Sequence, residues 1–191
     1  HSLYASTIVG EKGKIVSYEP LLRLGEQMNK SIKENNFSNI KIYNVALSDK
    51  IGKARLSLVA ENVGASSIQV VENDRDVEGE IEVNIDLLDN FSDKFTRLDM
   101  IKIDIEGNEF EALRGAEKLL KKFSPTIILE FSPHVYEKDY VGKTYDFYKY
   151  LISLNYQIKR IDDISVNIED DIKNGCFKDL HTNLICTANS R

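Results

Sequence analysis

Cysteine, proline and tryptophan are scarce in this sequence. Its 191 residues include two cysteines, three prolines and no tryptophan. Cys176 and Cys186 stand in no Cys-x-x-Cys or Cys/His spacing, so the sequence suggests neither a disulfide framework nor a zinc site. A protein with so few cysteines suits a reducing compartment, and we expect it to be cytoplasmic.

The sequence also lacks long hydrophobic runs and an excess of positive charge. Its longest apolar stretches, such as Pro125 to Leu129, are far shorter than the roughly 20 residues that cross a bilayer, so no membrane span is expected. The 25 basic and 31 acidic residues give a net charge of −6. This balance gives no reason to expect a nucleic-acid surface, which would favour clustered Lys and Arg. A small neutral or cationic ligand fits better, and the oligomeric state is left open.

The start of the chain carries neither an initiator methionine nor the basic and apolar regions of a signal peptide, since it begins with His1 and Ser2. We therefore expect the polypeptide to continue upstream of His1. A length of 191 residues with 42% hydrophobic content suits one hydrophobic core. Residues 1–191 are expected to form a single domain that is incomplete at its N-terminus.

Strand-like and helix-like patterns alternate along most of the chain. Period-two or buried apolar runs predict strands, and apolar residues at helical spacing predict helices. The expected strands are 14–19, 40–46, 53–59, 80–85, 98–105, 126–131, 156–161 and 183–187, and the expected helices are 21–35, 144–154 and one that begins at Asn108 with Glu111 in a capping box. This order predicts an α/β domain with a doubly wound, mostly parallel sheet, in which 98–105 is central and the last two strands pair antiparallel.

The residues that follow the expected parallel strands are strongly acidic. Ligands of an open α/β sheet bind outside the carboxyl ends of its strands. Glu19 ends the first strand, Asp104 and Glu106 end the central one, and Glu130 and His134 follow the next. Glu19 stands where a nucleotide-binding domain places an acid that accepts hydrogen bonds from ribose hydroxyls. The alternative is an acid that is merely solvated at a strand end.

Lys102 and Asp104 form a charged pair on the face of an otherwise apolar strand. Such a pair is costly to desolvate, so it is either functional or a buried structural ion pair. Glu106 precedes Gly107 in a tight turn and could point into the cleft. Glu109, by contrast, lies at a helix start, where the helix dipole alone explains a carboxylate.

Glu130 and His134 are the remaining candidates for acid–base chemistry. Glu130 interrupts an apolar strand, which solvation does not readily explain. His134 has a near-neutral pKa that suits a general base, although a lone histidine in a loop is more often simply exposed. Acidic clusters can also bind a divalent metal, but scattered carboxylates without fixed spacing give no basis for a metal site here.

The run Leu98 to Gly115 (LDMIKIDIEGNEFEALRG) resembles the central signature of FkbM-type methyltransferases. Further matches follow in the family's order at 15–20 (IVSYEP), 45–49 (VALSD), 64–68 (GASSI), 127–131 (IILEF) and 183–186 (NLIC). The resemblance covers nearly the whole chain apart from residues 132–180. It implies a Rossmann-like class I methyltransferase fold, a seven-stranded sheet with an antiparallel last strand, and methyl transfer from S-adenosyl-L-methionine, usually to oxygen.

The same resemblance implies roles for particular residues. Glu19 would hold the ribose, and Asp104 would lie near the methionine part of the cofactor and the acceptor. The adenine would lie along a short stretch that comprises Ala46, Leu47 and Ser48. The family's first strand and its glycine-rich D-x-G-A-N-x-G turn would come directly before His1.

A hydroxyl acceptor must lose its proton during methyl transfer, and acidic side chains suit a polyhydroxy acceptor such as a sugar or glycan. The candidate catalytic residues are Asp104, Glu106, Glu130 and His134. Two other functions remain open. An acid at a strand end also suits the ribose of NAD in an oxidoreductase, although the chain has no G-x-G-x-x-G turn. The domain could also be a non-catalytic Rossmann-like binding module.

Overall fold

The computed structural model describes residues 1–59, 77–132, 140–162, 168–169, 172 and 182–189. The helices are α1 (Ser2–Val9), α2 (Leu22–Glu34), the 3-10 helix η2 (Leu88–Lys94), α3 (Glu109–Arg114), α4 (Glu117–Phe123) and α5 (Tyr140–Ser153). The strands are β1 (Ile15–Tyr18), β2 (Ile40–Tyr43), β3 (Ala46–Leu47), β4 (Gly52–Val59), β5 (Val77–Asp86), β6 (Met100–Ile103), β7 (Thr126–Phe131), β8 (Tyr156–Arg160) and β9 (Thr182–Ala188). None of the described helices is both long enough and apolar enough to cross a membrane.

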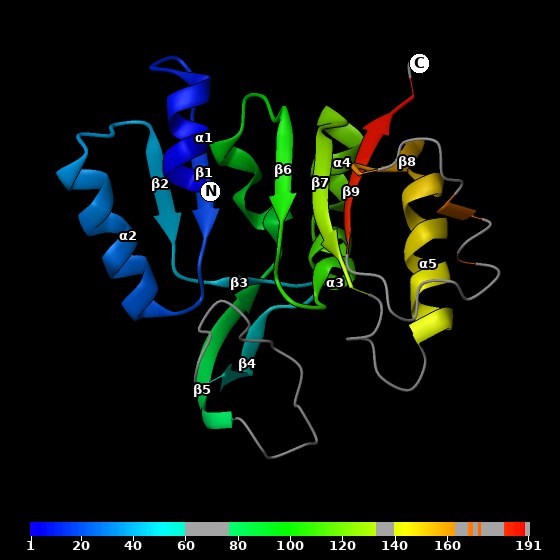
Figure 1. Ribbon diagram of the computed structural model, residues 1–191, viewed down its shortest axis with the longest axis horizontal. Coiled ribbons are helices and arrows are strands. Elements are labelled where there is room, and N and C mark those ends of the chain that lie inside the picture. Colours follow the sequence, from blue (N-terminus) through cyan, green and yellow to red (C-terminus); the bar gives the residue numbers. More distant parts are fainter. Residues whose placement is uncertain (60–76, 133–139, 163–167, 170–171, 173–181, 190–191) are drawn as a thin grey trace.

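The strands form three hydrogen-bonded ladders, with the orders β1-β2, β3-β5-β4 and β6-β7-β9-β8. Strands β1 and β2 run parallel, as do β6 and β7, whereas β9 is antiparallel to both β7 and β8. Figure 1 shows β1, β2, β6 and β7 pointing the same way, so their carboxyl ends lie along one rim. The mixed α/β class and the antiparallel pairing of the last two strands are confirmed. A single doubly wound sheet stays a prediction, because no hydrogen bonds join β1 to β6 in the described residues.

Strand β6 differs from the expected central strand 98–105. It is shorter, and within the residues that the structure describes β7 is the one strand that pairs with it, so it lies at the edge of its ladder there. Met100, at 53%, and Lys102 are exposed whereas Ile103 is buried, so one face of this strand reaches water. Lys102 stands on this exposed face and Asp104 directly follows the strand, so both side chains escape most of the desolvation cost that full burial would impose.

The main hydrophobic core lies between the β6-β7-β9-β8 ladder and the helices α3, α4 and α5. Alternate residues of β7 and β9, such as Ile127, Leu129 and Leu184, are almost fully buried in it. This alternation is the period-two pattern that the sequence predicted. A second, smaller cluster joins the base of the β4-β5 hairpin to the start of α2 through Leu21, Ala46, Leu56, Val83 and Ile85.

Helix α1 was not predicted from the sequence. It packs on β1 and on the turn before β2, where Ser2 Oγ lies 2.8 Å from Ser17 Oγ and Ser6 donates a hydrogen bond of 2.5 Å to Asn39. Its exposed side includes large apolar residues, because Tyr4 and Ile8 face solvent. Serines make the contacts on its packed side while apolar residues face solvent, so the helix gives no amphipathic signal, which explains why it was not predicted.

The helix expected to begin at Asn108 is two helices, α3 and α4, that are separated at Gly115 and Ala116. Asn108 occupies the N-cap position, but its side chain makes no capping hydrogen bond, so the predicted capping box is wrong. Helix α4 is instead capped from a distant segment. Asp89 of η2 accepts hydrogen bonds of 3.0 Å from the backbone N–H groups of Lys118 and Leu119.

Replacing Asp89 with alanine should lower the free energy of unfolding by about 1 kcal/mol, because it removes a side-chain cap from a helix start. Asp93 provides the control, since it belongs to the same 3-10 helix and pairs with the neighbouring Lys94. Urea denaturation of D89A and D93A measures both effects. Equal losses in the two variants would show that Asp89 does not act as the cap.

Candidate active site

The charged pair Lys102 and Asp104 lies where β6 reaches the rim. Lys102 Nζ is 3.0 Å from Asp104 Oδ2 and donates a second hydrogen bond of 3.2 Å to the carbonyl oxygen of Ile103. The two side chains are 30% and 35% exposed. A pair with this much access to solvent contributes little to stability, so the reading as a buried structural ion pair is wrong.

Three carboxylates meet beside this pair. One oxygen from each of Asp104, Glu106 and Glu130 lies within 4.8 Å of the other two. The parallel register explains the contact, because Ile103 is opposite Leu129 and the next residues are Asp104 and Glu130. The carboxylates are therefore close together in space, although they have no fixed spacing in the sequence. Such oxygens could hold a divalent cation, although exposed acidic groups often cluster without one.

We call Asp104, Glu106 and Glu130 the acidic cluster. Within it, the pKa of Glu130 is clearly shifted. A hydrogen bond with Asp104 is the main cause that raises the pKa of Glu130 to about 7. Partial burial and the negative charges of Asp104 and Glu106 act in the same direction, while the positive charge of Lys102 opposes them. Two carboxyl groups can form such a hydrogen bond only if they share a proton, so the pair titrates as one coupled unit.

The turn from β6 to α3 has an unusual backbone. Glu106 has φ 54° and Gly107 has φ 98°, so successive residues lie in the left-handed region. Glu109 is only 4% exposed. Its Oε1 accepts hydrogen bonds from the backbone N–H groups of Ile105 at 3.3 Å and Gly107 at 3.2 Å. Burial raises the pKa of Glu109, and these hydrogen bonds partly offset the increase. The helix dipole alone therefore does not explain this residue.

Glu19 lies directly after β1, at the same rim as Asp104, which directly follows β6 (Figure 1). Its carboxyl group is half-buried, and this burial raises its pKa, while a hydrogen bond of 2.9 Å from the Leu21 N–H to Oε1 lowers it. In the described part of the chain, its other oxygen, Oε2, receives no hydrogen bond.

The stretch Ala46 to Ser48 is mostly buried. Ala46 and Leu47 form β3 and pair with β5, and the Ser48 N–H donates a hydrogen bond of 2.9 Å to the carbonyl oxygen of Asp86. Arg114 of α3 forms an ion pair with Asp49, which follows directly. A contact between this stretch and adenine stays a prediction. His134 and the GASSI segment lie outside the described residues.

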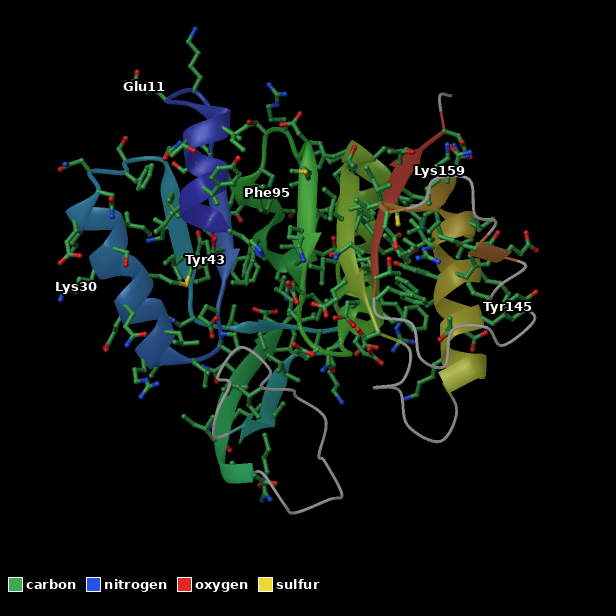
Figure 2. All side chains as sticks on the ribbon, in the orientation of Figure 1. Glu11, Lys30, Tyr43, Phe95, Tyr145 and Lys159 are labelled. Carbon is green, nitrogen blue, oxygen red and sulfur yellow. The ribbon has the colours of Figure 1, made fainter. Side chains whose placement is uncertain are left out.

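Sequence reasoning missed an aromatic cluster at the ends of β1 and β2. The rings of Tyr18 and Tyr43 stack at 5.6 Å, and Phe91 of η2 meets both rings at 5.1 Å. Figure 2 shows Tyr43 between these strands, toward their carboxyl ends. Burial raises the pKa of Tyr18. The cluster fixes the end of β1 and, with it, the starting position of Glu19.

The family described as "Methyltransferase FkbM domain" matches residues 2–169 of this sequence. The chain belongs to the FkbM methyltransferase family. A solved structure with the same fold is the methyltransferase FkbM from Methylobacillus flagellatus KT, which is 17% identical and superposes with a TM-score of 0.53. The match covers 91% of this chain but only 36% of that one. The comparison with curated proteins found no match.

The FkbM assignment agrees with the signature in residues 98–115. This segment contains β6, the acidic turn and α3, and it supplies Asp104 and Glu106 to the acidic cluster. The family's signature and the most acidic part of the rim are therefore the same piece of chain.

Proposed function

We propose that this FkbM domain is an S-adenosyl-L-methionine-dependent methyltransferase that methylates oxygen on a sugar or another hydroxylated small molecule. The observation that carries the proposal is the acidic cluster at the rim, in which Asp104 and Glu130 are close enough to share a proton. Carboxylates accept hydrogen bonds from several hydroxyl groups at once, which suits a polyhydroxy acceptor.

The residues at the rim fit the proposed cofactor. Glu19 presents a carboxylate oxygen that no described group occupies, at the position where α/β domains bind a ribose. Ala46, Leu47 and Ser48 would border the adenine, and Asp104 would lie near the methionine part. When bound, S-adenosyl-L-methionine supplies a methyl group that its positively charged sulfur activates for transfer.

The chain contributes alignment and a base. Methyl transfer is an in-line displacement, so the main requirement is that the acceptor oxygen is held in the correct direction. Asp104 and Glu106 would accept hydrogen bonds from neighbouring acceptor hydroxyls. Glu130 would take the proton of the reacting hydroxyl, because its pKa of about 7 lies near a physiological pH. His134 stays a second candidate for this step.

The first test of the proposal is which cofactor the protein binds. S-adenosylhomocysteine should raise the melting temperature of the protein and NAD should not, and at 100 times its Kd a ligand adds about 2.7 kcal/mol of stability. E19Q should weaken this binding, whereas E26Q, on the exposed side of α2, should not. Stabilisation by NAD instead would favour the oxidoreductase, which the FkbM match does not support.

An assay of methyl transfer tests the proposed reaction and its acceptor. The protein should transfer labelled methyl groups from S-adenosyl-L-methionine to members of a panel of glycans and small hydroxylated compounds. Binding of S-adenosylhomocysteine without transfer to any member would contradict catalysis and favour a non-catalytic binding module.

A further inference from the structure

The turn that carries the acidic cluster depends on an uncommon backbone conformation. Glu106 has a side chain and nevertheless lies in the left-handed region, at φ 54°. Such conformations cost free energy in residues other than glycine, and they persist only where surrounding contacts hold them. The neighbouring Gly107, at φ 98°, adopts its conformation without this cost.

Two of the contacts that hold the backbone around Glu106 come from Glu109. A single oxygen, Oε1, accepts hydrogen bonds from the N–H groups of Ile105 and Gly107, the residues on either side of Glu106. Fixing both neighbours restricts the backbone of the residue between them. The side chain that does this is buried, and a buried carboxylate is costly unless hydrogen bonds compensate. Its position is therefore explained by the turn and not by solvation at a helix start.

We propose that Glu109 is a positioning residue, which holds the Ile105–Gly107 turn in its left-handed conformation and thereby keeps Asp104 and Glu106 beside Glu130. Asp104 directly precedes the segment that Glu109 restrains and Glu106 lies in its middle, whereas Glu130 belongs to β7. Release of the turn would therefore move two members of the acidic cluster away from the third. This proposal rests on the proposed methyl transfer, because it assigns Glu109 to the same reaction.

Substitutions that differ in their hydrogen-bond acceptor test the idea. E109Q keeps an oxygen at the end of a side chain of the same length, so it should retain kcat to within about threefold. E109L removes the acceptor, and it should lower kcat by about 100-fold through misplacement of the acids. The Kd for S-adenosylhomocysteine should stay within about twofold in both variants, because Glu109 acts on the acidic side of the site. E111Q, a partly exposed neighbour in α3, should behave like the native protein.

Amide hydrogen exchange provides a readout that does not require turnover. The N–H groups of Ile105 and Gly107 should exchange at least about 10-fold faster in E109L than in the native protein, and at nearly native rates in E109Q. If E109L does not fold, E109D replaces it, because the shorter side chain cannot reach both N–H groups.

The outcomes separate this proposal from the function it rests on. A native protein without methyl transfer would contradict the proposed function, while the exchange rates would still test the role of Glu109 in the turn. Native exchange and native kcat in both E109L and E109D would overturn the positioning role. An equal loss of kcat in E109Q and E109L would overturn it too, since it would show that the charge matters and not the acceptor oxygen.

Discussion

Replacing Asp104 with asparagine should lower kcat for methyl transfer by about 100-fold or more, because the acidic cluster then loses the partner that tunes its base. Asparagine cannot share a proton with Glu130. The hydrogen bond with Asp104 is the main reason that the pKa of Glu130 lies near 7, so that pKa should fall toward its ordinary value, and a carboxylate with a lower pKa is a weaker base.

The same substitution should also change the pH at which activity is lost. A base acts only when it is deprotonated, so native activity should be lost as the pH falls through about 7. In D104N the remaining activity should persist to a lower pH, because Glu130 then stays deprotonated there. Profiles of kcat/KM for the native protein, D104N and the control D99N measure the shift. Asp99 is an exposed partner of Arg97, so D99N should match the native profile, and an unchanged midpoint in D104N would exclude the coupled pair as the base.

A side chain at Gly115 should destabilise the fold by about 3 kcal/mol or more. A Cβ atom built on Gly115 would lie 1.9 Å from the carbonyl oxygen of Ser48 and 2.9 Å from its carbonyl carbon. Both are backbone atoms that pairing with β5 and the hydrogen bond from Ser48 to Asp86 hold in place. Gly115 has φ −70° and ψ −4°, a conformation open to any residue, so the close approach alone requires glycine here.

Urea denaturation of G115A and G79A checks this prediction. Gly79 has open space around the position of a Cβ atom, so G79A should change the free energy of unfolding by no more than about 0.5 kcal/mol. Equal stability of the two variants would mean that the loop after β3 and the break between α3 and α4 can separate without cost.

The fold was predictable from the sequence where a local pattern matched the burial. Strand β7 was predicted with its observed bounds, since alternate side chains from Ile127 to Phe131 enter the core. The break at Gly115 was not predictable, because it depends on Ser48, which is distant in the sequence. The place of β6 at the edge of its ladder likewise depends on its neighbours in space and not on its own residues.

The sequence predicted the features of the site that depend on the order and direction of the strands. Parallel strands end at one rim, and this rule placed Glu19, Asp104 and Glu130 there. The hydrogen bond between Asp104 and Glu130 depends on the register of β6 against β7, which single-strand patterns do not give. Glu109 was misread because the helix dipole offered a sufficient local reason for a carboxylate, whereas its actual partners are the N–H groups of the preceding turn.

Helix α3 connects the two halves of the proposed site. One end carries Glu109 and the acidic turn, and at the other end Gly115 meets the Ser48 carbonyl while Arg114 pairs with Asp49. The helix is a rigid spacer of about 9 Å, at 1.5 Å per residue. The distance between the proposed nucleoside side and the proposed acceptor side is thus set by helical geometry, and we expect a shift of one side to move the other.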